Sequence, residues 1–362
     1  MVTPRSRTAN LPTDRARPLL ALVYAILFCA GCNGARPPAP ASTPAPALVA
    51  SNAPTPAAPP APSPGPNAGR SDPTCFAPLT GNSVRVALRP AKGQLVLGVV
   101  AGLKDASDEN LVHLRALVAE LRRNGAELLI AAGDLGDNSN SQEELLSALT
   151  SGDPPLPLMV LAGNREVRTD LDAAEATIRK RGLQLVDLSH TRVVDLGDAL
   201  IVGVPGVYEP RLLRADGACL YTQSDLDALA AWLDKLPPAA PPALMVAAVP
   251  PHGEGPQALD FTEGQNVGEM RFIPMLTSTR ARFGVFGQVW EAGGRAIDGQ
   301  GRAVPTGQFS NQLYVNPGAA DRTPWPMDDG STSHGGAALI TIRARQASFD
   351  SIREPPAPAR SP

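Results

Sequence analysis

Four short polar motifs follow predicted strands, and their residue types are those that bind metal ions or phosphate groups. They are Gly133-Asp134-Leu135-Gly136-Asp137, Gly163-Asn164-Arg165-Glu166, Pro250-Pro251-His252 and Gly287-Gln288-Val289-Trp290. Carboxylate, amide and imidazole groups offer the oxygen and nitrogen ligands of divalent cations. Each motif alone is also an ordinary turn signal, so their order and their shared place after strands indicate a site.

The segments that must position these motifs alternate between apolar runs and amphipathic stretches. Apolar runs predict strands at 95–100, 127–132, 156–161, 183–188, 192–196, 199–204, 244–249, 283–286, 312–315 and 337–343. A helical period predicts helices at 110–123, 141–149, 171–181 and 224–236, the last capped by Thr222 or Ser224. This alternation is typical of an α/β fold, in which functional residues gather in the loops at strand ends.

The motif series resembles that of the calcineurin-like metallophosphoesterases. Their motifs run Asp-x-His, Gly-Asp-x-x-Asp, Gly-Asn-His-Asp/Glu, a lone His and Gly-His-x-His, often followed by Asn-Pro-Gly, as in Asn316-Pro317-Gly318 here. The resemblance covers essentially all of residues 75–353. It implies two packed mixed β-sheets flanked by α-helices, and two metal ions that activate a water and hold the phosphate under attack.

Several positions of the family pattern are occupied by other residues in this chain. The resemblance places the first motif on Gly102 and Lys104, where Asp and His are usual. Arg165 stands where the family has the His that assists the leaving group, and Gln288 and Trp290 replace both histidines of the last motif. The resemblance therefore implies a domain that lacks part of the metal-binding set.

The losses fall mainly on one of the two metals that the resemblance implies. Of the first ion's positions only the bridging Asp134 remains, so we expect that site to be absent. The second ion keeps Asp134, Asn164 and His252, Gln288 can still offer a carbonyl oxygen, and Asp137 keeps a supporting position. We expect these ligands to bind one Mg²⁺, Mn²⁺ or Zn²⁺ more weakly than the complete set does, or to bind none.

Two of the replacements are cations and form a candidate anion-binding pair. Lys104 would compensate the charge that a missing dication leaves on a buried Asp134, and Arg165 is a planar cation suited to phosphate or carboxylate. The alternative is that both are surface residues over an inactive site. Trp290 either fills the vacated metal position or lines an open cleft. Prolines and charges predict that 323–329 is an exposed loop near the same end.

The N-terminal segment predicts export and membrane attachment. Arginines precede an apolar stretch at 19–30, which ends in Ala30-Gly31-Cys32. This ending resembles the lipobox of bacterial lipoproteins, although Cys29 stands where Leu is usual, and it implies a lipid on Cys32. Asn33, in place of the Asp that signals retention, favours the outer over the inner membrane. The alternative is an ordinary cleaved signal peptide with an incidental cysteine.

Composition divides the chain into four parts. We expect a signal peptide at 1–31, a disordered Pro/Ala-rich tether at 32–74, the domain at 75–353 and a disordered tail at 354–362. Extended as polyproline, the tether would hold the domain on the order of 100 Å from the membrane. The net charge of −3 argues against a nucleic-acid partner. Cys75 and Cys219 either form a disulfide or stay as two buried thiols.

Three functions remain open, and whether the chain is an enzyme at all is one of the open questions. The first is a pseudoenzyme or binding scaffold in the cell envelope, for an envelope protein or an anionic, phosphate-bearing ligand. The second is a weak single-metal phosphoesterase, with Arg165 or Lys104 stabilising the transition state. The third is a purely structural envelope lipoprotein. The resemblance implies the loss of one metal and of the leaving-group histidine. Each such loss lowers the rate of catalysis roughly 10²–10⁴-fold, which favours the first function.

Overall fold

The computed structural model describes residues 75–353, apart from 80, 89–92 and 279. The predicted signal peptide at 1–31, Cys32 with the tether at 32–74, and the tail at 354–362 lie outside the described residues. Among the described residues, no helix combines the length and apolar character needed to cross a membrane.

One of the two large sheets has six strands and is mixed. Its order is β17 (Gln346–Arg353), β16 (Gly336–Arg343), β2 (Leu95–Val100), β3 (Leu128–Ala132), β4 (Leu158–Leu161) and β5 (Leu185–Asp187). The strands from β2 to β5 are parallel, so their carboxyl ends share one edge, and β16 and β17 add an antiparallel pair.

The second large sheet has seven strands and is also mixed. Its order is β1 (Ser83–Arg85), β6 (Val193–Asp195), β7 (Leu200–Val204), β8 (Ala243–Ala247), β11 (Ala281–Phe286), β13 (Leu313–Asn316) and β12 (Arg295–Ile297). The strands β7, β8, β11 and β13 are parallel. Two short hairpins, β9 (Phe261–Thr262) with β10 (Gln265–Asn266) and β14 (Trp325–Pro326) with β15 (Thr332–Ser333), extend the loops that follow.

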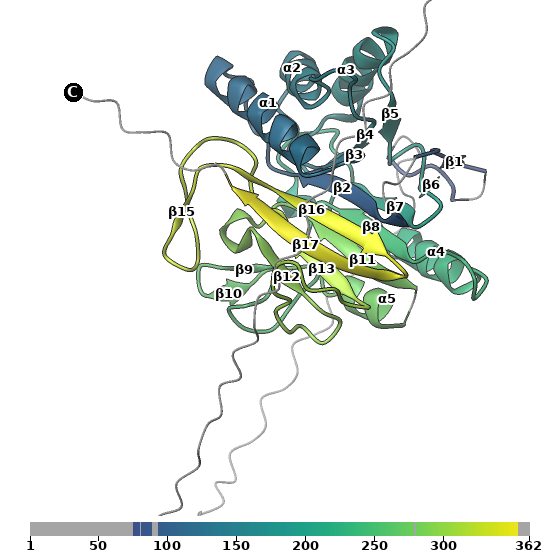
Figure 1. Cartoon of the computed structure of the whole chain (residues 1–362). Coiled ribbons are helices and arrows are strands. Elements are labelled where there is room, and N and C mark those ends of the chain that lie inside the picture. The colour runs from purple at the N-terminus through teal and green to yellow at the C-terminus, as the bar shows by residue number, and fades with distance from the viewer. Residues whose placement is uncertain (1–74, 80, 89–92, 279, 354–362) are drawn as a thin grey trace, which may run out of the picture. The chain divides into compact units, whose positions relative to one another are not determined.

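Helices flank the two sheets, as Figure 1 shows, with α1 to α3 beside the six-stranded sheet and α4 and α5 beside the other. They are α1 (Asp108–Arg123), α2 (Ser139–Leu149), α3 (Arg168–Lys180), α4 (Gln223–Asp234) and α5 (Phe272–Ser278). Side chains fix where they begin: Ser107 caps α1, and Asn138 and Thr222 form capping boxes at α2 and α4.

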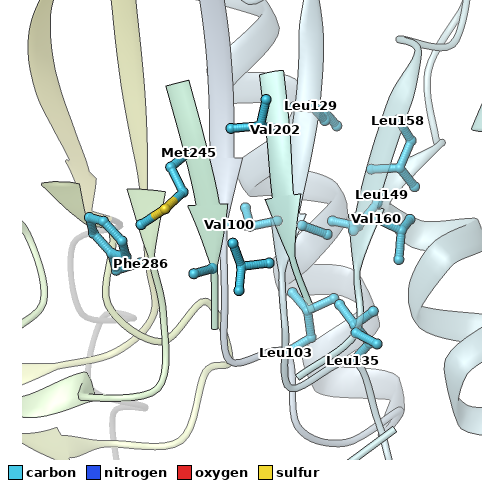
Figure 2. Packing of buried hydrophobic residues seen from close by; sticks show 14 of the residues in the cluster. Val100, Leu103, Leu129, Leu135, Leu149, Leu158, Val160, Val202, Met245 and Phe286 are labelled. Carbon is cyan, nitrogen blue, oxygen red and sulfur yellow. The ribbon is translucent and has the colours of Figure 1, made fainter. Parts of the chain in front are cut away.

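The core has two apolar layers because successive strand residues point to opposite faces. Leu97, Ile130 and Val246 belong to the layer between the sheets. Val100, Leu129 and Val160 of one sheet and Val202, Met245 and Phe286 of the other belong to the layer that the helices cover (Figure 2). Packing in these two layers fixes the strands, and the loops that follow them therefore start from fixed positions.

The expected fold class, two packed mixed β-sheets flanked by α-helices, is confirmed by these sheets and helices. The sequence patterns missed α5, which has seven residues and an internal Pro274, and β17, whose pattern is weakly apolar. His113 of α1 is buried, at 4% exposure, and packs against Gly335. The cap of α4 is Thr222 and not Ser224.

Candidate functional site

The loops that carry the four polar motifs meet at one end of the two sheets. A Cβ atom on Gly133 would lie 3.2 Å from Cα of Gly163 and 3.3 Å from Cβ of Ala248. A Cβ atom on Gly287 would lie 2.6 Å from the carbonyl oxygen of Ala132. Glycine is therefore needed where these backbones approach each other. Asp134, Asn164 and Gln288 each follow one of these glycines, and His252 comes four residues after Ala248.

Lys104 lies in a cluster that we call the lysine cage: Lys104, Asp321, Trp290 and Trp325. The Lys104 ammonium is 2.8 Å from Oδ2 of Asp321, whose side chain is fully buried. It is also 4.0 Å from the ring centroid of Trp290 and 4.2 Å from that of Trp325. The two indoles meet edge to face, with centroids 4.8 Å apart. One ammonium thus receives an ion pair and two cation–π contacts.

The indole of Trp290 occupies the space next to Gly102. A Cβ atom on Gly102 would lie 2.9 Å from the indole nitrogen of Trp290 and 3.1 Å from Cα of Ala319. Gly102 also has a positive φ of 60°, which most side chains avoid. A larger residue at 102 would meet the indole and the backbone of Ala319. Of the two arrangements expected for Trp290, the structure has the one in which its ring fills the position next to residue 102.

Asp134 is the carboxylate that both metal positions of the family pattern would share. It is 5% exposed, has a positive φ of 56°, and burial raises its pKa to about 6. The positive charges of Arg165 and Lys104 oppose this rise. The Trp290 indole N–H opposes it as well, although its geometry falls short of a full hydrogen bond. Lys104 therefore acts on Asp134 through space, while its direct partner is Asp321.

Glu166 fixes the two loops that carry Asp134 and Asn164. It is fully buried, its Oε1 accepts from the Leu135 N–H at 2.6 Å, and its Oε2 accepts from the Gly163 N–H at 2.5 Å. Burial and the nearby Asp134 raise the pKa of Glu166 to about 7, although the two hydrogen bonds lower it. Sequence reasoning placed Glu166 in a motif and gave it no role. The structure makes it a positioning residue.

Two donors of the second metal position are held by neighbouring groups, and a third has a buried oxygen without a partner. The amide nitrogen of Asn164 donates to the Leu212 carbonyl at 2.6 Å, which leaves its oxygen. Nδ1 of His252 lies 3.4 Å from Oδ2 of the buried Asp260, which leaves Nε2. Oε1 of Gln288 is buried and has no hydrogen-bond partner. Metal-binding side chains are commonly oriented by such outer contacts, and amide oxygen and imidazole nitrogen are donor types that suit a divalent ion.

The loop that carries Gln288 and Trp290 is tied down by Asn316. The Asn316 amide donates to the carbonyls of Val289 and Leu259 at 2.7 and 3.0 Å, and its oxygen accepts from the Gly318 N–H at 2.9 Å. All of these bonds are buried. The Asn-Pro-Gly motif thus anchors the last motif loop.

Arg165 and Asp137 form a pair at the rim of the site. Nε and Nη2 of Arg165 both donate to Oδ1 of Asp137, at 3.0 and 2.5 Å, and both side chains are partly exposed. Asp137 was expected to support the metal, and its observed contact is with Arg165. Both candidate anion-binding cations, Arg165 and Lys104, therefore already have a carboxylate partner.

Asp321 and Trp325 are the site residues that sequence reasoning missed. The exposed loop predicted at 323–329 is wrong for Trp325, which is half-buried and packs on Trp290. Asp321 follows the Asn-Pro-Gly motif closely, and its backbone N–H donates to the Gly102 carbonyl at 3.2 Å. The only sequence signal was an acidic residue and a tryptophan shortly after a family motif.

A second cluster of ionisable groups lies apart from this site, around α3. Ligand atoms of Asp172, Asp187 and His190 lie within 4.8 Å of one another. Arg168 is 2.5 Å from Asp172 and 2.9 Å from Asp187, so a guanidinium already compensates these carboxylates. Burial, and then Asp187, raise the pKa of the adjacent Glu175 to about 8. The arginine makes this a structural ion-pair cluster.

Cys75 and Cys219 are joined by a disulfide in the structure, with Cα atoms 5.5 Å apart. The bond connects the first described residue to the segment between β7 and α4. Phe76 continues the contact, since its ring meets Tyr221 edge to face at 6.3 Å. The N-terminal end of the domain is thus fixed to the segment 219–221.

Comparison with known proteins gives likenesses of fold. No family model and no curated protein matches the chain. A dimetal phosphatase from Danio rerio is 13% identical, over 72% of this chain and 98% of its own, with a TM-score of 0.45. A purple acid phosphatase from yellow lupin is 10% identical, and the match covers 73% of this chain and 52% of the phosphatase, with a TM-score of 0.44. GAP50, the anchor in the inner membrane complex of Plasmodium, is 10% identical. That match covers 75% of this chain and 88% of GAP50, with a TM-score of 0.45.

Proposed function

We propose that this chain is a pseudoenzyme: a metallophosphoesterase-like domain that serves as a binding scaffold and does not carry out two-metal hydrolysis. The observation that carries the proposal is the lysine cage. Lys104 lies 2.8 Å from Asp321 and about 4 Å from two indole rings, and Trp290 fills the space beside Gly102. A protein-borne cation and a large ring thus stand where the first metal of the family pattern would bind.

The groups left at the site do not replace what a second metal supplies. Two-metal hydrolysis needs one ion to activate the water and another to stabilise the leaving oxygen. Lys104 offers one charge, which Asp321 already compensates. Arg165, in the position of the leaving-group histidine, does not give up a proton near neutral pH, so it cannot act as a general acid, and it is engaged by Asp137. Both losses support a scaffold.

A weak single-metal phosphoesterase is the second candidate, supported by the held donors of the second position. Asp134, Asn164, His252 and Gln288 would hold one Mg²⁺, Mn²⁺ or Zn²⁺. Such an ion supplies Lewis acidity and lowers the pKa of a bound water. The chain's own contribution is orientation: Leu212 fixes the Asn164 amide and Asp260 faces the His252 imidazole.

The first experiment measures metal content. The chain is incubated with Mn²⁺ or Zn²⁺, passed through gel filtration and analysed by elemental mass spectrometry, beside Asp134→Ala and the matched control Asp137→Asn. We expect at most one ion per chain, lost in Asp134→Ala and kept in Asp137→Asn. A chain that retains no ion rules out the single-metal phosphoesterase, and two ions per chain rule out the pseudoenzyme.

Catalysis is tested on the same preparations with bis(p-nitrophenyl) phosphate and p-nitrophenyl phosphate. The scaffold predicts that release of nitrophenol is the same for the parent chain and for Asp134→Ala. Metal-dependent turnover that disappears in Asp134→Ala would instead establish the hydrolase.

The ligand of the scaffold is proposed to be an anionic, phosphate-bearing molecule or a protein of the cell envelope. Arg165 supports the first, because its side chain is 30% exposed and a phosphate could replace the exposed Asp137 as its partner. Inorganic phosphate binding by calorimetry, compared between the parent chain and Arg165→Ala, tests this. Equal affinity for the two would leave the envelope protein as the proposed partner.

The proposed location is the bacterial cell envelope, with the chain anchored in the outer membrane by a lipid on Cys32. The sequence supports this through Ala30-Gly31-Cys32 at the end of the apolar stretch, followed by Asn33 and a Pro/Ala-rich segment. Detergent phase partitioning and mass spectrometry of the parent chain and Cys32→Ser test it. The parent should enter the detergent phase with a mass increase of acyl groups, and Cys32→Ser should stay in the aqueous phase.

A further inference from the structure

A cleft of about 1010 Å³ lies beside the second metal position. His252 lines this cleft, and the carbonyl of Leu212, another lining residue, accepts from the Asn164 amide. Most of the other lining residues have no part in the proposed function. Buried apolar side chains form part of the lining, namely those of Leu226, Val249 and Met275. The charged groups of the cleft have both signs, so their placement determines what the cleft can bind.

Two arginines lie where the cleft meets the metal position. Arg211 lines the cleft, and the backbone N–H of Arg214 donates to the Asn164 carbonyl at 2.9 Å. Both residues are exposed, and neither has an ion-pair partner among the residues that the structure describes. The positive charges of Arg165 and Arg214 both lower the pKa of Asp134, so both lie near it. These guanidinium groups therefore favour an anion, such as a phosphate, at this end of the cleft.

The rest of the cleft lining carries more carboxylates than cations. Glu209, Asp227 and Glu269 are acidic, and the cation that lies among them is Arg271. Nη1 of Arg271 is 2.8 Å from Oε1 of Glu269, and its Nη2 is 4.0 Å from Oε1 of Glu209. Asp227 is exposed and accepts from the Gln223 amide at 2.9 Å. Three carboxylates and one guanidinium leave an excess of two negative charges, which favours a cationic group.

Glu269 is the buried carboxylate of the cleft, and one of its oxygens has room for a further donor. Its Oε1 accepts from the guanidinium and from the backbone N–H of Arg271, at 2.8 and 3.0 Å. Its Oε2 accepts from the hydroxyl of Tyr221, at 3.4 Å. A carboxylate oxygen can accept two hydrogen bonds, so Oε2 can take an ammonium as well. Both Glu269 and Tyr221 line the cleft.

The acidic and the basic parts of the cleft are close to each other, because Glu269 pairs with the loop of His252. Pro251 and Glu269 form a parallel bridge. The His252 N–H donates to the Glu269 carbonyl at 3.2 Å, and the Glu269 N–H donates to the Pro250 carbonyl at 2.9 Å. Backbone segments paired in this way lie about 5 Å apart. A ligand that extends from the metal position to Glu269 therefore needs only a short spacer between its charged groups.

We propose that the cleft binds a phosphorylated primary amine, with its phosphate among Arg165, Arg211 and Arg214 and its ammonium at Oε2 of Glu269. This inference rests on the proposed binding of a phosphate-bearing ligand and narrows the class of that ligand. The methylene groups between the two charges suit the apolar lining. A primary ammonium fits better than a quaternary one, because a carboxylate oxygen accepts hydrogen bonds and a quaternary ammonium has no N–H. The phosphoethanolamine group, free or as a lipid headgroup, has this chemistry.

Calorimetry on the full chain compares O-phosphoethanolamine with propyl phosphate, in which a methyl group replaces the ammonium. A charge-assisted hydrogen bond to a buried carboxylate predicts that O-phosphoethanolamine binds at least about tenfold more tightly. Phosphocholine should bind about as weakly as propyl phosphate. Glu269→Gln, checked for folding by circular dichroism, should bind all three with similar affinity. The matched control Glu254→Gln, at an exposed carboxylate outside the cleft lining, should keep the preference of the parent.

Equal affinity of the parent for O-phosphoethanolamine and propyl phosphate would overturn this inference and leave the proposed phosphate binding intact. Binding of neither compound would overturn both. A preference for the primary amine that persists in Glu269→Gln, or tighter binding of phosphocholine by the parent, would also overturn the inference. A comparison with sn-glycero-3-phosphoethanolamine identifies the source of the ligand. Tighter binding of this diester supports a lipid headgroup, and tighter binding of O-phosphoethanolamine supports a free phosphorylated amine.

Discussion

The two halves of the candidate site differ in how their polar groups are used. In the first half, Lys104 is paired with Asp321 and lies over two indole rings, and Trp290 packs beside Gly102. The buried indole N–H groups of Trp290 and Trp325 have no hydrogen-bond partner there. In the second half, Asn164 and His252 are oriented by Leu212 and Asp260, and each keeps a ligand atom that these contacts do not use. The buried Oε1 of Gln288 has no hydrogen-bond partner. One half is filled by its own side chains, and the other leaves donor atoms of the kinds that bind metal ions.

This difference bears on how the buried carboxylate of Asp134 is compensated. An uncompensated buried charge costs several kcal/mol, so removal of a dication calls for another charge nearby or for protonation. At Asp134, the positive charges of Arg165 and Lys104 act through space, while burial still raises its pKa to about 6 and so makes protonation easier than for an exposed carboxyl. The variants below test each half.

The largest effect is expected from Lys104→Met in the first half. It leaves the fully buried Asp321 without its cation, which should lower the free energy of unfolding by about 3–5 kcal/mol. Urea denaturation measures this. The matched double variant Lys104→Met with Asp321→Leu should regain most of the loss, because the buried charge is gone. A single variant within about 1 kcal/mol of the parent would mean that Lys104 does not hold this half together.

Glu166→Ala should be the most damaging change in the second half. It leaves the buried N–H groups of Leu135 and Gly163 without acceptors, at about 1–3 kcal/mol each. The same variant should lose any bound Mn²⁺, since Glu166 fixes both loops that carry metal donors. Glu254→Ala, at an exposed site, is the control and should change stability by less than about 0.5 kcal/mol. Unchanged metal content in Glu166→Ala would contradict its positioning role.

Glu175 is a buried carboxyl outside both halves of the candidate site, next to Arg168 and Arg179. Its pKa is raised from 4.5 to about 8, so the folded state binds a proton that the unfolded state has released. Its stabilising contribution is complete below pH 4.5 and is lost as the pH rises to about 8. From pH 5 to pH 9, the parent should therefore lose on the order of 2 kcal/mol more stability than Glu175→Gln.

Denaturation curves across this pH range, with and without Mn²⁺, check the prediction for Glu175. Added metal should leave the difference between the parent and Glu175→Gln unchanged, because the Arg168 cluster is compensated by its own guanidinium. Parallel pH profiles for the two proteins would show that Glu175 is ionised in the folded state at neutral pH.

Arg165→Ala should have the smallest effect. The Arg165–Asp137 pair is partly exposed, and such pairs contribute about 0–1 kcal/mol. Metal content should stay as in the parent, because Arg165 is not a ligand of the second half. Thermal unfolding and elemental analysis measure both. A loss above about 2 kcal/mol would show that Arg165 compensates Asp134 and not merely Asp137.

Much of the fold could be predicted from the sequence, because apolar runs and helical periods report burial directly. The strand at 95–100 and the end of the helix at Arg123 match the structure. Strand β17 was missed since it shows the core mainly Ala347 and Phe349 among polar residues. Helix α5 was missed since seven residues with an internal proline give too little periodicity.

The site could be predicted only in part. Motifs after strands located Asp134, Asn164 and His252, because parallel strand ends meet at one edge of a sheet. The lysine cage could not be predicted, since Asp321 and Trp325 reach Lys104 from loops far along the chain whose path no local pattern encodes. The cleft beside His252 is likewise built from separate segments, of which the Tyr208 and Met270 regions are two.

The bond between Cys75 and Cys219 also determines how the domain responds to tension. When the chain is pulled from its two ends, force passes from residue 75 through the disulfide to residue 219. The intervening residues form a closed covalent loop with a sequence separation of 144 between its cysteines, and they carry no load. The segment with strands β1 to β7, and with Asp134 and Asn164 between them, therefore cannot be extended by pulling while the disulfide is intact. The part that can extend under force begins only beyond Cys219.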